Sequence, residues 1–278
     1  MLIIIGILIG LVLGLTGSGG SVFAVPLLIV FAGLSPSEAV GLSLVTVAAS
    51  AVFGCLRFRS KQPVLWKPGL VFAFTGVLLV PLGQWLNHLL PAYITVIAFS
   101  VVAVTVAQQM WRRAINHPEL ASITRGRDLS ELSGEESVTC RMNPTGQFQL
   151  KPRCLIGMIL GGALVGLMSG FLGVGGGFLI IPILLYLSQI ETARAVSTSL
   201  VIISIISSVG FVSYFLHSNS SLNDTVYMLL PLVIGGIVGM FFGQRLTVRI
   251  ADDHLQKGFA MTLVLMSVIM CVSYFYGN

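Results

Sequence analysis

Long apolar stretches separated by short polar segments dominate this chain. Seven stretches contain no Asp, Glu, Lys or Arg: residues 1–34, 39–56, 68–111, 154–190, 195–223, 225–244 and 258–278. A transmembrane helix needs about 20 apolar residues, so several of these stretches hold two helices. Only 9% of all residues are charged, which is too few to cover the surface of a water-soluble domain. The pattern predicts an all-α integral membrane protein with 8–10 helical segments.

The chain contains an internal repeat. Residues 10–54 align without gaps onto residues 166–210, and 14 of these 45 positions are identical. Five apolar elements follow in the same order in each half. They are residues 2–16, 20–33, 37–56, 68–88 and 92–111 in the first half, and 154–169, 177–189, 193–216, 225–248 and 256–276 in the second. We therefore divide the chain into a first repeat (1–113), a polar linker (114–152) and a second repeat (153–278).

An odd number of elements per half predicts that the second half is inverted in the membrane relative to the first. If all ten elements cross or turn back as expected, the 15 Lys and Arg residues all fall on one side of the membrane. The positive-inside rule makes that side cytoplasmic, so segments 57–67 and 112–153 are expected inside and both termini outside. Residues 1–34 have no basic flank or cleavage site, so they are expected to remain as structure and not to act as a signal peptide.

Glycine clusters interrupt the first two elements of each half. These elements are only about 13–16 residues long, short of the ~30 Å hydrocarbon core, so each pair is expected to form a re-entrant or spanning hairpin. Helix amino termini that begin at the two turns would converge near the middle of the membrane, where their free N–H groups suit a small anion. Opposing helix carboxyl ends could instead hold a cation, and close helix packing is the structural alternative. Outside the turns, the four-residue spacing of Gly6, Gly10 and Gly14, and of Gly235, Gly239 and Gly243, predicts close helix packing. The turn residues proposed for binding are Thr16, Gly17, Ser18, Gly19, Gly20, Ser21, Gly173, Gly175, Gly176 and Gly177.

The two turns and their surroundings resemble the TauE/SafE sulfite exporter family. The resemblance rests on paired Gly-x-x-Gly-x-Gly-Gly-Ser/Gly turns, each followed by a proline (Pro26, Pro182), then Ala-Val-x-x-Ser-Leu-Val segments and late Gly-Gln pairs. It covers nearly the whole chain except residues 112–153. It implies a bacterial-type inner-membrane permease that moves a small anion such as sulfite, sulfoacetate or a sulfonate, driven by an ion gradient with a proton or sodium as coupling ion. We expect alternating access, with one repeat half rocking against the other.

Polar residues inside the predicted helices provide further candidates for the substrate site. They are Ser43, Thr46, Gln84, Ser197, Thr198, Ser199 and Gln244. The hydroxyl groups either face the glycine turns or bond back to their own helix. Gln84 and Gln244 occupy equivalent places in the two halves and either line a pore or pair helices.

Three charged residues are candidates for coupling or gating. Glu38 is the only acidic residue among the first hundred, yet Ser35-Pro36-Ser37-Glu38 also has the sequence of a helix capping box. Arg194 occupies the equivalent place in the second half and is otherwise an interface anchor. Arg245 either draws anions toward the cytoplasmic mouth or extends along the helix to the membrane surface.

Several functions are disfavoured by the sequence. Membrane-embedded catalysis needs clustered His, Asp, Glu or Cys, which these helices lack, so we expect no enzyme and no cofactor. The four cysteines and four histidines show no metal-ligand spacing, so no metal is expected and the thiols are expected to be free. The net charge of +5 is scattered over loops, which argues against nucleic acid. An anion channel, or a membrane subunit of a larger complex, is the alternative to a transporter.

Overall fold

Every element of the described chain is a helix. The computed structural model describes residues 1–17, 19–58, 64–116, 152–187, 192–217, 222–247 and 252–276. The first half contains α1 (Leu2–Thr16), the 3₁₀ helix η1 (Gly19–Phe23), α2 (Ala24–Ala32), α3 (Pro36–Phe58), α4 (Trp66–Leu89) and α5 (Ala92–Asn116). The second half contains α7 (Pro152–Leu172), α8 (Gly177–Leu187), α9 (Thr192–His217), α10 (Leu222–Thr247) and α11 (Asp252–Tyr276). The predicted all-α class is confirmed, and Ser18 and most of the predicted linker lie outside the described residues.

The helices have the length and the surface of a membrane protein. Within the described residues, five stretches are long and apolar enough to cross a bilayer: Pro36–Arg57, Trp66–Leu89, Cys154–Leu172, Arg194–Leu216 and Tyr227–Leu246. Large apolar side chains cover the outside, among them Phe74, Leu216 and Tyr227, which are 67%, 76% and 80% exposed. Such a surface is stable against lipid and not against water. The protein is therefore a multi-pass membrane protein.

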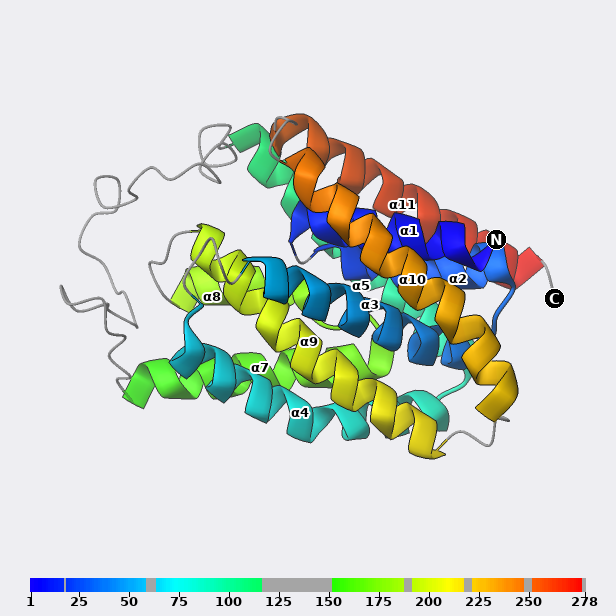
Figure 1. Cartoon of the computed structure of the whole chain (residues 1–278), viewed down its shortest axis with the longest axis horizontal. Coiled ribbons are helices and arrows are strands. Elements are labelled where there is room, and N and C mark those ends of the chain that lie inside the picture. The colour runs from blue at the N-terminus through cyan, green and yellow to red at the C-terminus, as the bar shows by residue number, and fades with distance from the viewer. Residues whose placement is uncertain are drawn as a thin grey trace.

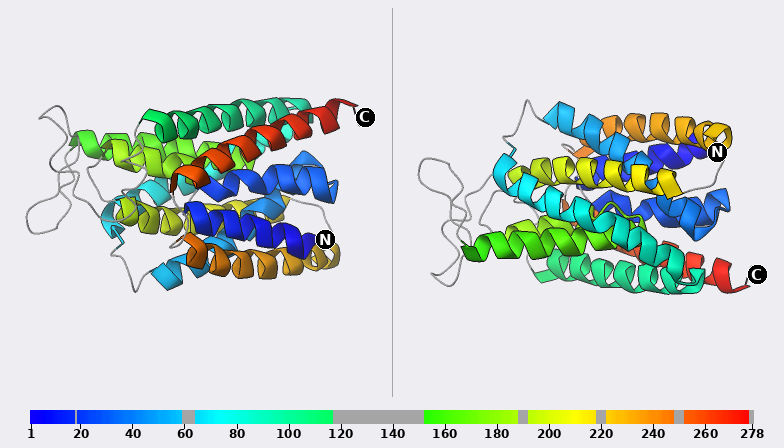
Figure 2. Two further views of the ribbon diagram at one scale, coloured as in Figure 1. Left: turned by 90° about the horizontal axis from the view of Figure 1, so that it is seen from above. Right: turned by 90° about the horizontal axis from the view of Figure 1, so that it is seen from below.

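The two hairpins enter the bundle from opposite ends. Figure 1 shows α1 starting at the end where both chain termini lie, whereas α7 starts at the other end, and both views of Figure 2 agree. Helices α3 and α9 pack against each other in the centre. The most extensive contacts join α1 to α10, α4 to α7, α3 to α9 and α5 to α11, so each of these pairs unites the first half with the second.

Glycine seams hold two of these pairs together. Gly6, Gly10 and Gly14 of α1 face α10, and a Cβ at Gly14 would stand 3.0 Å from the Cα of Gly243. A Cβ at Gly235 would likewise overlap α1 backbone. The packing role predicted for these glycines at four-residue spacing is thus confirmed, because only small residues let two helix backbones approach so closely. Helices α4 and α7 form the equivalent seam.

Three boundaries differ from the prediction. Helix α7 has 21 residues and passes Gly170, where a turn was expected, ending only before Gly173 with its φ of 69°. At 1.5 Å per residue it is long enough to span the hydrocarbon core, so the expected short length is wrong for this helix. The segment that follows the first glycine turn begins as the 3₁₀ helix η1, before α2 starts. Helix α5 extends to Asn116, into the segment assigned to the linker.

The expectation that the cysteines form no disulfide is wrong for Cys154, which is disulfide-bonded. Cys55 and Cys271 are half-buried and form no disulfide. No short cysteine spacing in the sequence predicts this disulfide, because disulfide pairing depends on distances that only the fold sets.

Candidate functional site

Both glycine turns end their first helix in the same way. Gly17 and Gly173 have φ values of 72° and 69°, in the left-handed region that favours glycine. The amide of Gly17 donates to the carbonyl of Leu13 over 2.8 Å, and the amide of Gly173 donates to that of Ser169 over 2.9 Å. The repeat seen in the sequence is therefore reproduced in backbone geometry at the helix ends.

After α1 ends, hydrogen bonds of Thr16 hold the first turn together. The Thr16 hydroxyl donates to the Val12 carbonyl and accepts the amide of Gly20, both over 2.9 Å. The chain then forms the 3₁₀ helix η1 before α2 starts. Because Thr16 already satisfies the Gly20 amide, that N–H group is not available to a solute.

The second turn is wound differently and leads directly into a helix. Gly175 and Gly176 both have φ of 67°, and α8 begins at once with Gly177. The amide of Leu179 bonds to the carbonyl of Gly176 over 3.1 Å. The remaining N–H groups in the first turn of a helix have no acceptor within that helix and carry positive partial charge. The start of α8 therefore has the chemistry expected of an anion-binding helix terminus.

Each turn contacts the opposite half of the chain at an equivalent place. A Cβ on Gly17 would stand 2.5 Å from Val196 Cγ1 in α9, and a Cβ on Gly173 would stand 2.6 Å from Val40 Cα in α3. Val40 and Val196 are themselves repeat partners. Helix α8 also packs against η1. The two turns thus meet at the central α3–α9 pair, as the sequence predicted that they would converge.

Ser43 is the predicted hydroxyl that reaches a glycine turn. Its Oγ lies 2.6 Å from the carbonyl oxygen of Gly173 in the other half and 2.8 Å from that of Val40. Its repeat partner Ser199 donates to Val196 within its own helix over 2.8 Å. The two equivalent serines therefore differ, since one ties the second turn to α3 and the other bonds back.

Two serines that the sequence analysis did not single out lie at the second turn. Ser169 and Ser207 are fully buried, and neither hydroxyl has a hydrogen-bond partner among the described residues. Ser169 supplies the carbonyl that holds Gly173, and a Cβ on Gly175 would stand 2.7 Å from the Oγ of Ser207. A buried hydroxyl without a partner costs about 1–3 kcal/mol, which is unusual unless it has another role.

Comparison of aligned positions in the two halves identifies these serines from the sequence. At the 156-residue offset, Ser169 aligns with Leu13 and Ser207 with Ala51. Polar residues in one half therefore replace apolar residues in the other. The second half is the more polar at these two positions, whereas the first turn has Thr16, Ser18 and Ser21 where the second has Leu172, Val174 and Gly177.

The two repeat-equivalent glutamines also differ. The Nε2 of Gln84 is buried and donates to the carbonyl of Gly210 over 2.6 Å, which pairs α4 with α9. The Nε2 of Gln244 is buried without a partner among the described residues, 3.2 Å from where a Cβ on Gly54 would stand. Gln84 thus pairs helices, whereas Gln244 keeps an unused donor.

The remaining predicted hydroxyls bond to their own helices. Thr46 donates to Leu42, and Ser197 and Thr198 both donate to the carbonyl of Arg194. Thr198 also accepts the amide of Leu65 over 3.2 Å, which places it against the start of α4. Helix back-bonding, the structural alternative, is what these three residues show.

The charged candidates lie at helix ends. Glu38 accepts bonds from the amide and hydroxyl of Ser35 over 3.1 and 2.7 Å, so the capping box at the start of α3 is confirmed. Arg194 is half-buried near the start of α9. Arg245, near the end of α10, places its guanidinium 4.3 Å from the centroid of the Phe241 ring. The described residues contain no group of three His, Cys, Asp or Glu side chains that could hold a metal ion.

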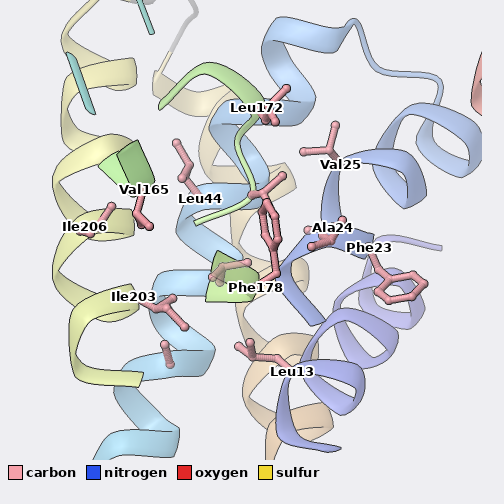
Figure 3. Close-up of a cluster of buried hydrophobic side chains, with 14 of the residues drawn as sticks. Leu13, Phe23, Ala24, Val25, Leu44, Val165, Leu172, Phe178, Ile203 and Ile206 are labelled. Atoms are coloured by element: carbon pink, nitrogen blue, oxygen red, sulfur yellow. The ribbon is translucent and has the colours of Figure 1, made fainter. Parts of the chain in front are cut away.

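Apolar side chains close the space between the two turns. Phe178 at the start of α8 and Phe23 and Ala24 around the start of α2 belong to one buried cluster, shown in Figure 3. Leu172, the last residue of α7, lies in the same cluster. Buried apolar side chains therefore separate the two turns in this structure.

Comparison with known proteins identifies a family over almost the whole chain. Residues 2–270 match the family described as Sulfite exporter TauE/SafE. A probable membrane transporter protein of Xylella fastidiosa (strain 9a5c) is 29% identical over 252 residues, which cover 90% of this chain and 85% of the relative.

More distant relatives have similar names. The probable membrane transporter protein YunE of Bacillus subtilis is 23% identical over 97% of this chain and 94% of its own length. A probable membrane transporter protein of Methanocaldococcus jannaschii is 24% identical over 97% of this chain and 94% of its own length. No solved structure matches the chain. The protein is a membrane transporter and not an enzyme, and it belongs to the sulfite exporter TauE/SafE family.

Proposed function

We propose that this protein is a secondary transporter that moves a small sulfur-containing or organic anion, such as sulfite, sulfoacetate or a sulfonate, across the cell inner membrane by alternating access. The anion binds at the second glycine turn, between the start of α8 and the neighbouring segments of α3 and α9. The first turn supports this site from the opposite half. A proton or sodium ion supplies the driving gradient.

One observation carries the proposal. The second turn combines the amino terminus of α8 with two buried hydroxyls, those of Ser169 and Ser207, that have no partner among the described residues. Buried hydroxyls without a partner are unfavourable in a purely structural hairpin, and hydroxyls beside a helix amino terminus favour a negative solute. Gln244 adds an unused amide donor at the neighbouring α3–α10 contact.

The expected affinity suits transport. A helix amino terminus contributes up to ~2 kcal/mol toward an anion. Each of two or three charge-assisted hydrogen bonds contributes ~1.5–3 kcal/mol. Desolvation of a buried anion costs several kcal/mol, which offsets much of this gain. Binding should therefore be weak to moderate, so that the solute is released on the far side.

The contacts favour particular moving units. Rocking of one sequence half against the other would separate the α1–α10 and α4–α7 glycine seams, in which backbones touch. We therefore assign α1, α2, α10 and α11 to one unit and α4, α5, α7 and α8 to the other. The units meet along the α3–α9 and α5–α11 pairs. This exchange of helices, together with the opposite entry of the two hairpins, supports the inverted-repeat plan.

A single substitution tests these units. The hydroxyl of Ser100 in α5 lies 3.1 Å from the sulfur of Cys271 in α11. Ser100→Cys should therefore form a disulfide with the native Cys271 under mild oxidation, and flux in proteoliposomes should stop until a reductant is added. Ser100→Cys with Cys271→Ala is the control and should ignore the oxidant. Full flux in the cross-linked protein would contradict these units.

Orientation can be tested at two exposed helix starts. We propose that Lys67, at the start of α4, faces the cytoplasm and that Tyr227, near the start of α10, faces the outside. Cysteines placed at 67 or 227, in a variant lacking Cys55 and Cys271, should react differently with a membrane-impermeant maleimide added to intact cells. Labelling at 227 alone is expected, and labelling of both positions would refute the inverted topology.

Flux measurements test the function itself. Purified protein in proteoliposomes should take up radiolabelled sulfite or a sulfonate in a saturable way that depends on an imposed proton or sodium gradient. A channel would show flux that neither saturates nor concentrates the solute. Absence of flux and of thermal stabilisation with every small sulfur oxyanion and organosulfonate tested would overturn the proposed substrate class.

A further inference from the structure

Two arginines from different halves share one aromatic ring at one end of the bundle. Arg57, in the last turn of α3, places its Cζ 4.7 Å from the centroid of the Phe241 ring. Arg245, in the last turn of α10, places its Cζ 4.3 Å from the same centroid. Both arginines are exposed residues. Each interaction with the ring holds the arginine side chain in place.

Arg57 and Arg245 place two positive charges on one ring, and none of the described residues supplies a carboxylate paired with either. Their separation cannot exceed the sum of the two distances to the shared centroid. No salt bridge to either arginine occurs among the described residues. Like charges on one ring repel each other, and an anion that binds both arginines offsets that repulsion. Arginine pairs of this kind favour phosphate, because the guanidinium donates two parallel hydrogen bonds to phosphate oxygens.

The neighbouring side chains indicate where such a phosphate comes from. Val52 and Leu56 on α3 are 43% and 65% exposed, and Phe242 and Leu246 on α10 are 55% and 41% exposed. The arginines therefore lie at the border between an apolar surface that lipid tails cover and the helix ends at the membrane surface. A lipid headgroup occupies that depth while its chains lie against the apolar side chains.

We propose that Arg57, Phe241 and Arg245 form a binding site for the headgroup phosphate of an anionic membrane lipid. The lipid bridges the ends of α3 and α10, at the contact between the central helix pair and a peripheral unit. The two arginines lie in the last turns of α3 and α10, and the lipid site does not depend on the identity of the proposed substrate.

The repeat-equivalent positions do not carry this pair of arginines. Arg57 corresponds to Ser213 at the offset of 156 residues, and Phe241 and Arg245 correspond to Pro81 and Trp85 at the offset of 160 residues that aligns Gly83-Gln84 with Gly243-Gln244. Trp85 is 60% exposed, as is common for tryptophan at a membrane interface. One end of the bundle thus carries two arginines on a phenylalanine ring, whereas the equivalent position at the other end carries the uncharged Trp85. We therefore expect the lipid to come from one leaflet only.

Lipid binding can be measured on the purified full-length protein. Native mass spectrometry and thermal unfolding in detergent should be compared with added phosphatidylglycerol, added phosphatidylcholine and inorganic phosphate alone. Phosphatidylglycerol should give a retained adduct and raise the melting temperature, whereas phosphatidylcholine and inorganic phosphate should not. Arg57→Gln and Arg245→Gln should each weaken phosphatidylglycerol binding about fivefold. Phe241→Leu should weaken it about two- to fivefold.

Lys67→Gln is the matched control. Lys67 is an exposed cation at the start of α4, and its removal takes away one charge without touching the ring. It should leave lipid binding close to that of the unmodified protein. Equal losses for Lys67→Gln and the arginine variants, or equal binding of both lipids, would overturn the site. Stabilisation by inorganic phosphate alone would assign the arginines to a soluble anion instead and would also overturn the proposal.

Discussion

The first and second glycine turns share a sequence motif and differ in what they do with it. The first has one left-handed glycine among its described residues, Gly17, and closes through the bond from Gly20 to Thr16. The second turn has three left-handed glycines, and the helix that follows it, α8, starts without a 3₁₀ segment. Near the second turn, two buried serines that have no hydrogen-bond partner among the described residues replace Leu13 and Ala51. A duplicated hairpin has thus kept its packing in both copies, whereas these two hydroxyls occur beside the second turn alone.

The largest expected effect on stability distinguishes the two helix-ending glycines. Gly173→Ala places a Cβ 2.6 Å from the backbone Cα of Val40, whereas Gly17→Ala meets a Val196 methyl group. Both variants adopt a left-handed backbone at about 1–2 kcal/mol, and the clash with rigid backbone should add about 1–3 kcal/mol at Gly173. Thermal unfolding in detergent should therefore show a clearly larger decrease in melting temperature for Gly173→Ala. Equal decreases would mean that the two turns are equally constrained.

The glutamines should separate stability from transport. Gln84→Leu removes the bond to Gly210 and should lower the free energy of unfolding by about 0.5–1.5 kcal/mol. Gln244→Leu removes a buried donor that has no partner among the described residues, so stability should stay the same or rise. Its KM for the transported anion should increase. If Gln244→Leu is the less stable protein, or if its KM is unchanged, Gln244 has a structural role only.

The smallest effect should come from the equivalent serines of α3 and α9. Ser43→Ala loses the contact that ties the second turn to the first half and should cost about 0.5–1 kcal/mol of unfolding free energy. Ser199→Ala loses only a bond within its own helix and should be nearly neutral. Chemical unfolding of the two variants in parallel gives the comparison. A larger loss for Ser199→Ala would reverse the assignment of the tied turn.

Much of the fold follows from hydrophobic pattern and repeat. Apolar stretches located all ten elements, the spacing of Gly6, Gly10 and Gly14 predicted a packing seam, and Ser35 with Glu38 predicted a cap. These features depend on neighbours in sequence. The end of α7 was missed because Gly170 is part of a glycine cluster, yet it packs inside the helix against Val80.

The candidate site was harder to predict. A serine in an apolar helix has the same hydropathy whether it bonds back to its helix, as Ser204 does, or lies without a partner, as Ser207 does. The difference arises from contacts between distant segments, such as that of Ser207 with Gly175. The sequence also did not predict which helices contact each other across the two halves. An apolar helix face indicates that the helix packs, but it does not identify the partner helix.

Sulfite binding to Ser207→Ala tests the central claim most directly. Ser204→Ala is the matched control, since Ser204 lies one turn earlier in α9 and its hydroxyl already bonds to Val201 over 2.8 Å. Isothermal titration should give an affinity about tenfold or more lower for Ser207→Ala, as loss of a hydrogen bond to a charged group predicts. Its melting temperature without ligand should stay unchanged, and Ser204→Ala should bind normally. Equal affinities in both variants would show that the second turn does not hold the anion.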